Sequence, residues 1–187
     1  MIYFDFKKIR FSFSFGFFFV LAFLCTDSSI LAAYSLVFCV IHELAHLFAM
    51  REFGAEVTEV SFYGGGIKIS SHGLSELGKA QQLAVYSAGC ITNISMALIY
   101  LVINSVELAL INLCLAAMNL LPISYLDGGK ILSNLFPQKD KILKSLSFIT
   151  TVLVVVLFVF GVVLFVDFKL SSLTITIFVF VLSHILD

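Results

Sequence analysis

Residues 41–46 read Ile-His-Glu-Leu-Ala-His, and they lie inside an apolar run that extends over residues 30–49. A run of about 20 apolar residues predicts a helix that crosses a membrane. Ionisable side chains at that depth make insertion costlier, by about 2.5 to 3.5 kcal/mol for a charged carboxylate at a helix centre, so they indicate a functional use. This stretch therefore predicts a membrane-embedded fold and also the place where its chemistry occurs.

The spacing of the two histidines suits a metal ion. On a helix, His42 and His46 are one turn apart on the same face, and Glu43 lies beside them. Two imidazoles so placed are typical of a zinc site, and the adjacent carboxylate could take a proton from a water molecule. The alternative is a pair of buried histidines satisfied by backbone or carboxylate groups, which is less favoured where lipid offers no water. The pattern predicts one Zn²⁺ per chain.

The composition of the whole chain agrees with a membrane protein. Of the 187 residues, 60 % are hydrophobic and only 12 % are charged, and the mean hydropathy is +1.09. Soluble domains contain about 25 % charged residues. The net charge of −1, without a long basic or acidic run, predicts no nucleic-acid partner. The four cysteines are scattered through apolar segments, which indicates buried side chains and no disulfide framework.

Six apolar segments predict an all-α, polytopic membrane protein that forms one membrane-embedded domain over residues 1–187. These segments are residues 11–25, 30–49, 83–103, 108–121, 146–166 and 170–186. The first segment follows basic residues, as a signal peptide would. No small-residue cleavage site follows it, however, so we expect it to be retained as a short membrane helix.

Basic residues predict the orientation of these helices. With six crossings, ten of the eleven Lys and Arg residues fall on one side of the membrane, and only Lys169 falls on the other. Because basic residues are enriched on the cytosolic side, we expect both termini to lie in the cytosol.

Two β-type runs within residues 57–70 are joined by Gly64, Gly65 and Gly66, which predicts a small hairpin between the second and third membrane helices. One interpretation is a turn without a chemical role. The other is an exposed strand edge close to the metal, which pairs with an extended peptide through backbone hydrogen bonds. The glycines would permit a close approach of that peptide.

Two histidines leave a zinc site open to at least one further protein ligand. Asp127 is the candidate that we favour, because it follows the helix break at Pro122, precedes two glycines and is the only acid in that apolar stretch. It could instead be a turn-forming aspartate. Cys39 is the alternative ligand, since it shares a helix face with the two histidines, although second-shell packing would also explain its position.

Two motifs now stand together: His42-Glu43-Leu44-Ala45-His46 in one helix, and Asn119-Leu120-Leu121-Pro122-Ile123-Ser124-Tyr125-Leu126-Asp127-Gly128-Gly129 in a later one. Over residues 30–136, the chain resembles the site-2 protease family of intramembrane zinc metalloproteases. The resemblance implies that His42, His46 and Asp127 bind zinc and that Glu43 is the catalytic base. It also implies that Asn119 helps to hold the substrate or the oxyanion.

The resemblance extends to two further stretches. Tyr63-Gly64-Gly65-Gly66 would belong to a membrane-reentrant β segment that presents the substrate. Ala88-Gly89-Cys90-Ile91-Thr92-Asn93 matches a family stretch that usually reads Ala-Gly-Pro-x-x-Asn, in which Cys90 replaces the proline and Asn93 is retained. We expect Asn93 to contribute to substrate binding.

The chain most resembles a compact bacterial subgroup that includes the sporulation protease cleaving a sigma-factor precursor. Those enzymes usually carry a C-terminal nucleotide-sensing CBS domain, which is not expected here. The implied activity is regulated intramembrane proteolysis of a membrane-spanning or membrane-associated protein in a bacterial cell membrane, with membrane regulators as further partners. The alternatives are sigma-factor processing in sporulation, a membrane metal transporter, and a scaffold without catalytic activity.

Overall fold

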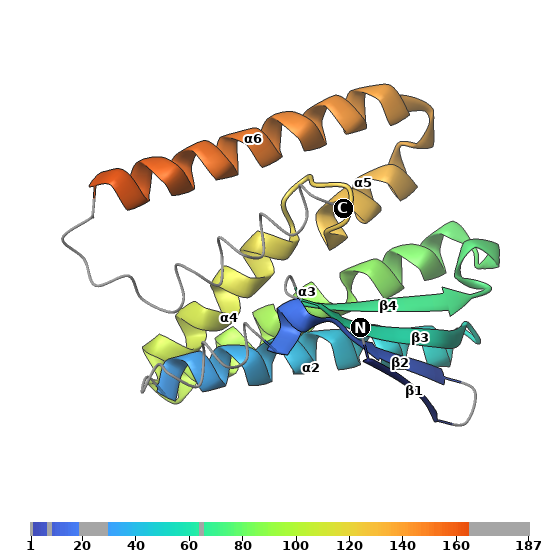
Figure 1. The fold of residues 1–187 in the computed structure, drawn as a ribbon, viewed down its shortest axis with the longest axis horizontal. Coiled ribbons are helices and arrows are strands. Elements are labelled where there is room, and N and C mark those ends of the chain that lie inside the picture. Colours follow the sequence, from blue (N-terminus) through green and yellow to red (C-terminus); the bar gives the residue numbers. More distant parts are fainter. Residues whose placement is uncertain (1, 7–8, 19–29, 64–65, 165–187) are drawn as a thin grey trace. The chain divides into compact units, whose positions relative to one another are not determined.

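The structure is a computed structural model of the chain, and it describes residues 2–6, 9–18, 30–63 and 66–164 (Figure 1). The chain divides into two compact units. One unit comprises Tyr34–Glu56 and His72–Leu153 and is mainly helical. The other unit contains most of the β-strands.

Five labelled helices follow one another along the described chain: α2 (Ile30–Glu52), α3 (Lys79–Val102), α4 (Val106–Asn119), α5 (Asp127–Leu135) and α6 (Asp140–Leu164). Helix α3 packs against both α4 and α5. The buried positions on α3 and α4 are mostly small, among them Gly89, Ala97, Ala109 and Ala116. Small residues allow helices in apolar surroundings to approach closely. Helix α3 is therefore the central support of this unit.

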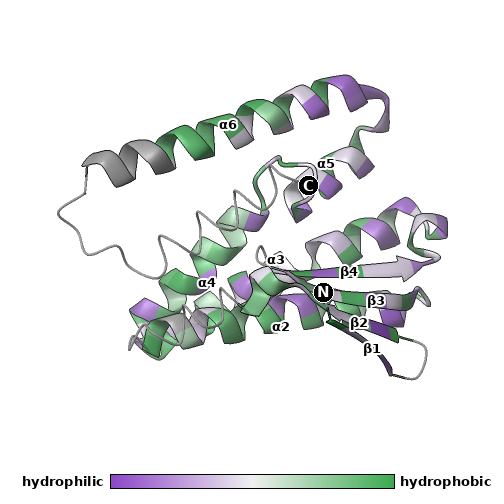
Figure 2. Cartoon of the chain, in the orientation of Figure 1, coloured by the Kyte–Doolittle hydropathy of each residue, from purple (hydrophilic) through white to green (hydrophobic). Residues whose placement is uncertain are grey.

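Two segments of these helices, Ala33–Glu52 and Lys79–Val102, are long and apolar enough to cross a membrane. Only 22 % and 28 % of their most apolar windows are buried, whereas the core helix of a soluble protein would be mostly buried. Large apolar side chains such as Phe48 and Val102 are 67 % and 81 % exposed. Figure 2 shows apolar residues along α4 and the middle of α6 as well. Exposed apolar faces of this kind suit lipid.

The six expected crossings are supported only in part. Helices α2 and α3 match the second and third, while α4 is a shorter apolar helix. Helix α6 matches most of the fifth, and the sixth, residues 170–186, lies outside the described residues. The break between the fourth crossing and Asp127 is confirmed, because α4 ends at Asn119 and α5 begins at Asp127.

The expected start of the first membrane helix is wrong. Ile9–Phe13 forms strand β2, residues 15–18 are helical, and residues 19–25 lie outside the described part of the chain. Residues 11–15 alternate Phe-Ser-Phe-Ser-Phe, a period of two that is typical of a strand and that an average hydropathy conceals. In the strand, Ser12 is 2 % exposed, and its hydroxyl donates to Glu59 Oε1 at 3.1 Å.

The strands form one sheet in the order β1-β2-β3-β4. Strand β1 (Ile2–Phe6) is antiparallel to β2, and β2 is parallel to β3 (Glu56–Tyr63). Phe13 lies opposite Phe62, and the two rings stack with centroids 4.6 Å apart. Strand β4 (Gly66–His72) follows β3, which confirms the expected pair of strands between α2 and α3. The all-α class is corrected accordingly, because β1 and β2 extend this pair to a four-stranded sheet.

Candidate metal centre

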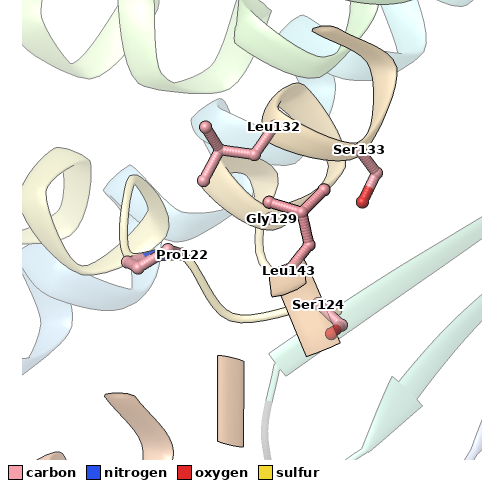
Figure 3. Close-up of a pocket in the computed structure, with 6 residues that line it drawn as sticks. All are labelled: Pro122, Ser124, Gly129, Leu132, Ser133 and Leu143. Atoms are coloured by element: carbon pink, nitrogen blue, oxygen red, sulfur yellow. The ribbon is translucent and has the colours of Figure 1, made fainter. Parts of the chain in front are cut away.

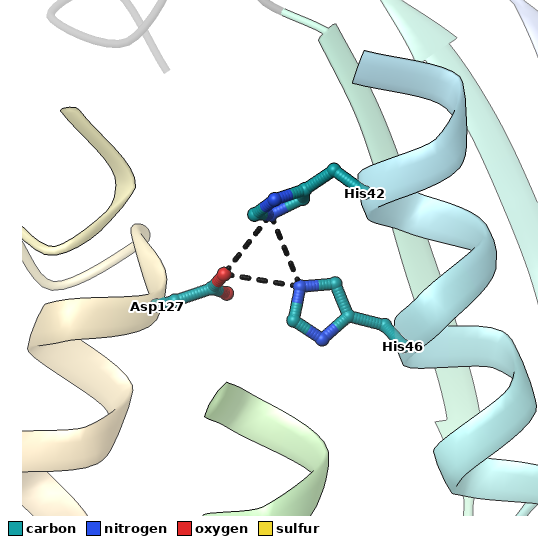
Figure 4. Close-up of side chains that lie close together, drawn as sticks. All are labelled: His42, His46 and Asp127. Atoms are coloured by element: carbon teal, nitrogen blue, oxygen red, sulfur yellow. Dashed lines mark hydrogen bonds and ion pairs between the residues drawn. The ribbon is translucent and has the colours of Figure 1, made fainter. Parts of the chain in front are cut away.

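Three side chains from two helices that are far apart in sequence converge in the helical unit (Figure 4). His42 and His46 project from α2, with their Nε2 atoms 3.2 Å apart. Oδ2 of Asp127, the first residue of α5, lies 3.1 Å from His42 Nε2 and 3.0 Å from His46 Nε2. All three side chains are buried, and within the described residues they form the group that could hold a metal ion.

The donor set fits zinc. Two ligands bound tetrahedrally to one Zn²⁺, at about 2.0 Å each, lie about 3.3 Å from one another. The three atoms are 3.0 to 3.2 Å apart, so small side-chain adjustments would suffice. Two imidazoles and one carboxylate also match catalytic zinc sites, in which three protein ligands leave a fourth position for water or substrate.

The tautomer of His46 is fixed by the backbone of α3. His46 Nδ1 lies 2.7 Å from the carbonyl oxygen of Val85, which is fully buried. A carbonyl oxygen can only accept a hydrogen bond, so the proton of a neutral ring must be on Nδ1. The lone pair of Nε2 then faces the cluster, as metal ligation requires.

Lys130 organises the carboxylate of Asp127. Its Nζ lies 3.5 Å from Oδ1, on the other side of the carboxylate from the imidazoles, which face Oδ2. Both residues are in the first turn of α5, three positions apart, so the pair is local to one helix. This ion pair favours an Asp127 that contributes a single oxygen to the metal.

The loop before α5 explains why two glycines follow Asp127. The chain folds back after α4, and a Cβ atom on Gly128 would lie 2.1 Å from the carbonyl oxygen of Leu120. A Cβ atom on Gly129 would lie equally close to the carbonyl oxygen of Ile123. Only glycine fits at either position, because both obstacles are backbone atoms. The glycine pair therefore allows the loop to pack against the start of α5 and so positions Asp127.

The same loop is also fixed to α6. The backbone N–H and the hydroxyl of Ser124 both donate to Ser147 Oγ, each at 2.9 Å. Loop and helices enclose a small pocket (Figure 3), which is lined by Pro122, Ser124, Gly129, Leu132, Ser133 and Leu143. The loop that precedes Asp127 is thus fixed to both α5 and α6.

Gly89 allows α3 to pass close to the two imidazoles. A Cβ atom at this position would lie 2.5 Å from the Nε2 atoms of both His42 and His46. The glycine belongs to the Ala-Gly-Cys stretch noted in the sequence, but the sequence alone assigned it no role. Cys90, its neighbour, is buried with its Sγ atom 3.7 Å from Asp127 Oδ2.

Three other residues expected at the site, Glu43, Asn93 and Asn119, lie on α2, α3 and α4. Glu43 is half-buried on α2 and interacts electrostatically with the three cluster residues and Lys130. Asn93 is fully buried, with Nδ2 3.3 Å from His42 Nδ1. Asn119 is half-buried, and its amide donates to the carbonyl oxygen of Leu115 at 3.0 Å.

Two of the expected residues that the structure describes, Cys39 and Gly66, are not part of this cluster. Cys39, the alternative ligand, is half-buried on α2 but does not belong to the metal-binding group of the described residues. Gly66 begins β4 with φ of +131°, in the other unit. Gly64 and Gly65 lie outside the described residues.

Besides Gly89, two contributors to the site, Val85 and Lys130, were missed in the sequence. The carbonyl of Val85 could not have been found, because a backbone acceptor has no residue-type signature. Lys130 could have been found, since an acid and a base three residues apart at a helix start predict an ion pair.

Comparisons with known proteins find similarity in both sequence and fold. Residues 105–164, which include Asp127, match the family model of peptidase family M50. A zinc metalloprotease of Methanocaldococcus jannaschii is 30 % identical over 115 residues, which are 57 % of this chain and 34 % of the relative. The chain therefore spans about a third of the length of that relative.

The fold is shared with a solved structure, that of a site-2 protease from Methanocaldococcus jannaschii. The TM-score is 0.69, the match covers 96 % of this chain and 91 % of that one, and the sequence identity is 21 %. The family model and the related sequence agree with the shared fold. The chain is therefore similar to peptidase family M50 in sequence over residues 105–164, and to a site-2 protease in fold.

Proposed function

We propose that the chain is a zinc metalloprotease that hydrolyses a peptide bond of a membrane-spanning or membrane-associated protein, within or near the lipid bilayer. The observation that most supports this proposal is the buried cluster of His42, His46 and Asp127, with Glu43 beside it on an apolar helix. Metal binding alone would also serve a transporter. A transporter has no need for a carboxylate that directly follows the first ligand and can accept a proton.

Each residue of the site would have its own role in the reaction. His42, His46 and Asp127 would hold the zinc, which when bound supplies Lewis acidity that polarises the scissile carbonyl and acidifies a water molecule. Glu43 accepts the proton of the attacking water and passes it to the leaving amine. Asn119 assists by donating a hydrogen bond to the substrate once its amide has turned away from the Leu115 carbonyl.

The proposed activity can be tested on the purified full chain. The zinc-loaded protein should cleave a single-span peptide in detergent micelles or vesicles, lose this activity on chelation and regain it when zinc is added. Elemental analysis should give about one zinc per chain. A protein that holds zinc but cleaves none of a panel of single-span peptides would contradict the proposal, and metal flux into vesicles without cleavage would favour a transporter.

We also propose that the chain is one multi-pass membrane domain with both termini in the cytosol. The start of α6 would then face the cytosol, in agreement with Lys141 and Lys144. Ser145 is exposed in this basic stretch. In a variant without the four native cysteines, Ser145→Cys should react with a membrane-impermeant thiol reagent in inverted vesicles and remain unreacted in right-side-out cells. The opposite pattern would invert the topology.

Strand β4 is proposed to bind the substrate as an added strand. It is one of the two edge strands of the described sheet, and an edge strand presents backbone groups with which an extended peptide can pair. Such pairing depends little on side chains, which suits a protease that accepts several sequences.

Proline substitutions at two neighbouring positions of β4 test this binding mode. Ile67 and Lys68 follow one another in the strand, so their N–H groups point toward opposite sides. One of Ile67→Pro and Lys68→Pro should remove a hydrogen bond to β3 and destabilise the sheet. The other should leave the sheet and zinc content intact but slow cleavage, because it removes a donor from the free edge. Unchanged cleavage by the well-folded variant would exclude β4 from substrate binding.

A further inference from the structure

We infer that Asn93 is a positioning residue whose side-chain oxygen fixes the ring of His42 for metal binding, and that its amide turns over when the metal binds. The inference rests on the metal site of the proposed function and needs no assumption about the substrate.

Asn93 has an unusual environment for an asparagine. It lies on α3 and is fully buried, and its Nδ2 is 3.3 Å from Nδ1 of His42. Its Oδ1 is also buried but has no hydrogen-bond partner. Among the described residues, only one other buried side-chain oxygen, that of Asn112, shares this condition. Buried polar atoms nearly always have a partner, so an unpaired one needs an explanation. Asn93 differs from Asn112 in that its amide lies against a candidate metal ligand, His42.

The contact of Asn93 with His42 sets the tautomer of the His42 ring. An amide nitrogen only donates, so His42 Nδ1 must accept the hydrogen bond from Asn93. The proton of the neutral ring is then on Nε2, which lies 3.1 Å from Asp127 Oδ2 and can donate to it. This arrangement satisfies His42 and Asp127, but a proton occupies the nitrogen that a metal ion needs.

Metal binding requires the other tautomer of His42. The ring must present the lone pair of Nε2, so its proton moves to Nδ1 with no change in net charge. That Nδ1–H group needs an acceptor, and Asn93 is the side chain that lies against it. A turn of the amide by about 180° exchanges its nitrogen and oxygen, which occupy nearly equal space. The unpaired oxygen then accepts from Nδ1 without any backbone movement.

The second histidine of the site already has this arrangement. His46 Nδ1 donates to the carbonyl oxygen of Val85, which lies two turns before Asn93 on the same helix. With the amide of Asn93 turned, α3 would supply one acceptor to each imidazole. Helix α3 would therefore set the orientation and the tautomer of both ligands on α2.

Two substitutions separate the acceptor from the size of the side chain. Asn93→Leu keeps a similar volume but offers no acceptor, and Asn93→Asp keeps an acceptor but cannot donate. Zinc affinity is measured by competition with a chelator. We expect Asn93→Leu to bind zinc about 10- to 100-fold more weakly, as is typical for the loss of such a partner, and Asn93→Asp to stay within about threefold of the wild type.

Asn112→Leu is the matched control. Asn112 is an equally buried asparagine on α4, also with an unpaired oxygen, and its amide donates to the Leu108 carbonyl of its own helix. This variant should keep the zinc affinity of the wild type. In addition, nitrogen NMR of the histidine-labelled wild type should show the proton of His42 on Nε2 without zinc and on Nδ1 with zinc.

Several results would overturn the inference. Wild-type affinity in Asn93→Leu, or an equal loss in Asn93→Asp or in Asn112→Leu, would show that the side-chain oxygen of Asn93 has no special role. A His42 proton that stays on one nitrogen would exclude the turn of the amide, and this test needs no variant to fold. Failure of the wild type to bind zinc would instead overturn the metal site itself, and the inference with it.

Discussion

Replacing Glu43 by glutamine should reduce peptide cleavage by about 10²- to 10⁴-fold, the usual contribution of a general base, while zinc stays bound. The substitution preserves the size and shape of the side chain but removes its ability to accept a proton. Glu43 is outside the metal-binding group, so the His42, His46 and Asp127 cluster should be unaffected. The measurement is the initial rate of cleavage of a single-span peptide, together with the zinc content of the same sample.

Glu52→Gln provides the control for this experiment. It makes the same chemical change at an exposed position at the end of the same helix, and it should leave the rate unchanged. Full activity of Glu43→Gln would remove Glu43 from the mechanism. Loss of zinc along with activity would show that its carboxylate belongs to the ligand set.

Replacing Gly89 by alanine should have the next largest effect, on metal binding itself. The added Cβ would lie 2.5 Å from ring atoms of His42 and His46, and the rings cannot easily retreat because Asp127 and Val85 hold them. Overpacking of this kind costs about 1–3 kcal/mol, which corresponds to roughly 5- to 150-fold in zinc affinity if the rings absorb the displacement. Chelator competition measures the change.

Gly78→Ala is the corresponding control at the start of α3. A Cβ atom there would meet only Gln81 Oε1, at 3.4 Å, which is an ordinary contact. This variant should bind zinc like the wild type. If Gly89→Ala also binds zinc normally, α2 and α3 must be able to move apart in the folded protein.

The sequence predicted the helices better than the sheet. Helices α2 and α3 are long, continuous apolar segments, so composition and length are enough to locate them. Strand β2 was not predicted, because the Phe and Ser residues at positions 11–15 have a high average hydropathy, which also favours a membrane helix. The parallel pairing of β2 with β3 could not be predicted, because it joins segments separated by about 50 residues and depends on tertiary contacts.

The candidate metal ligands could be named from the sequence because zinc accepts few side-chain types. Histidine and aspartate are rare in apolar segments, and their presence there indicated His42, His46 and Asp127 before the fold was known. The supporting atoms were not predictable in the same way. The closeness of Gly89 to the imidazoles and the unpaired oxygen of Asn93 both depend on how α3 packs against α2. A local sequence pattern does not determine that packing.

The separation of the ligands along the chain has a consequence for biosynthesis. His42 and Asp127 are 85 residues apart, and the helix that supplies the acceptor for His46 lies between them. A nascent chain that ends after α3 carries the two imidazoles but lacks Asp127, the third member of the cluster. If these three residues hold zinc as proposed, the site would not be complete until α5 has left the ribosome, and hydrolytic activity would begin only when the core is nearly finished. Once formed, the metal would tie distant segments together much as a disulfide closes a long loop, and it would stabilise the finished fold by mass action.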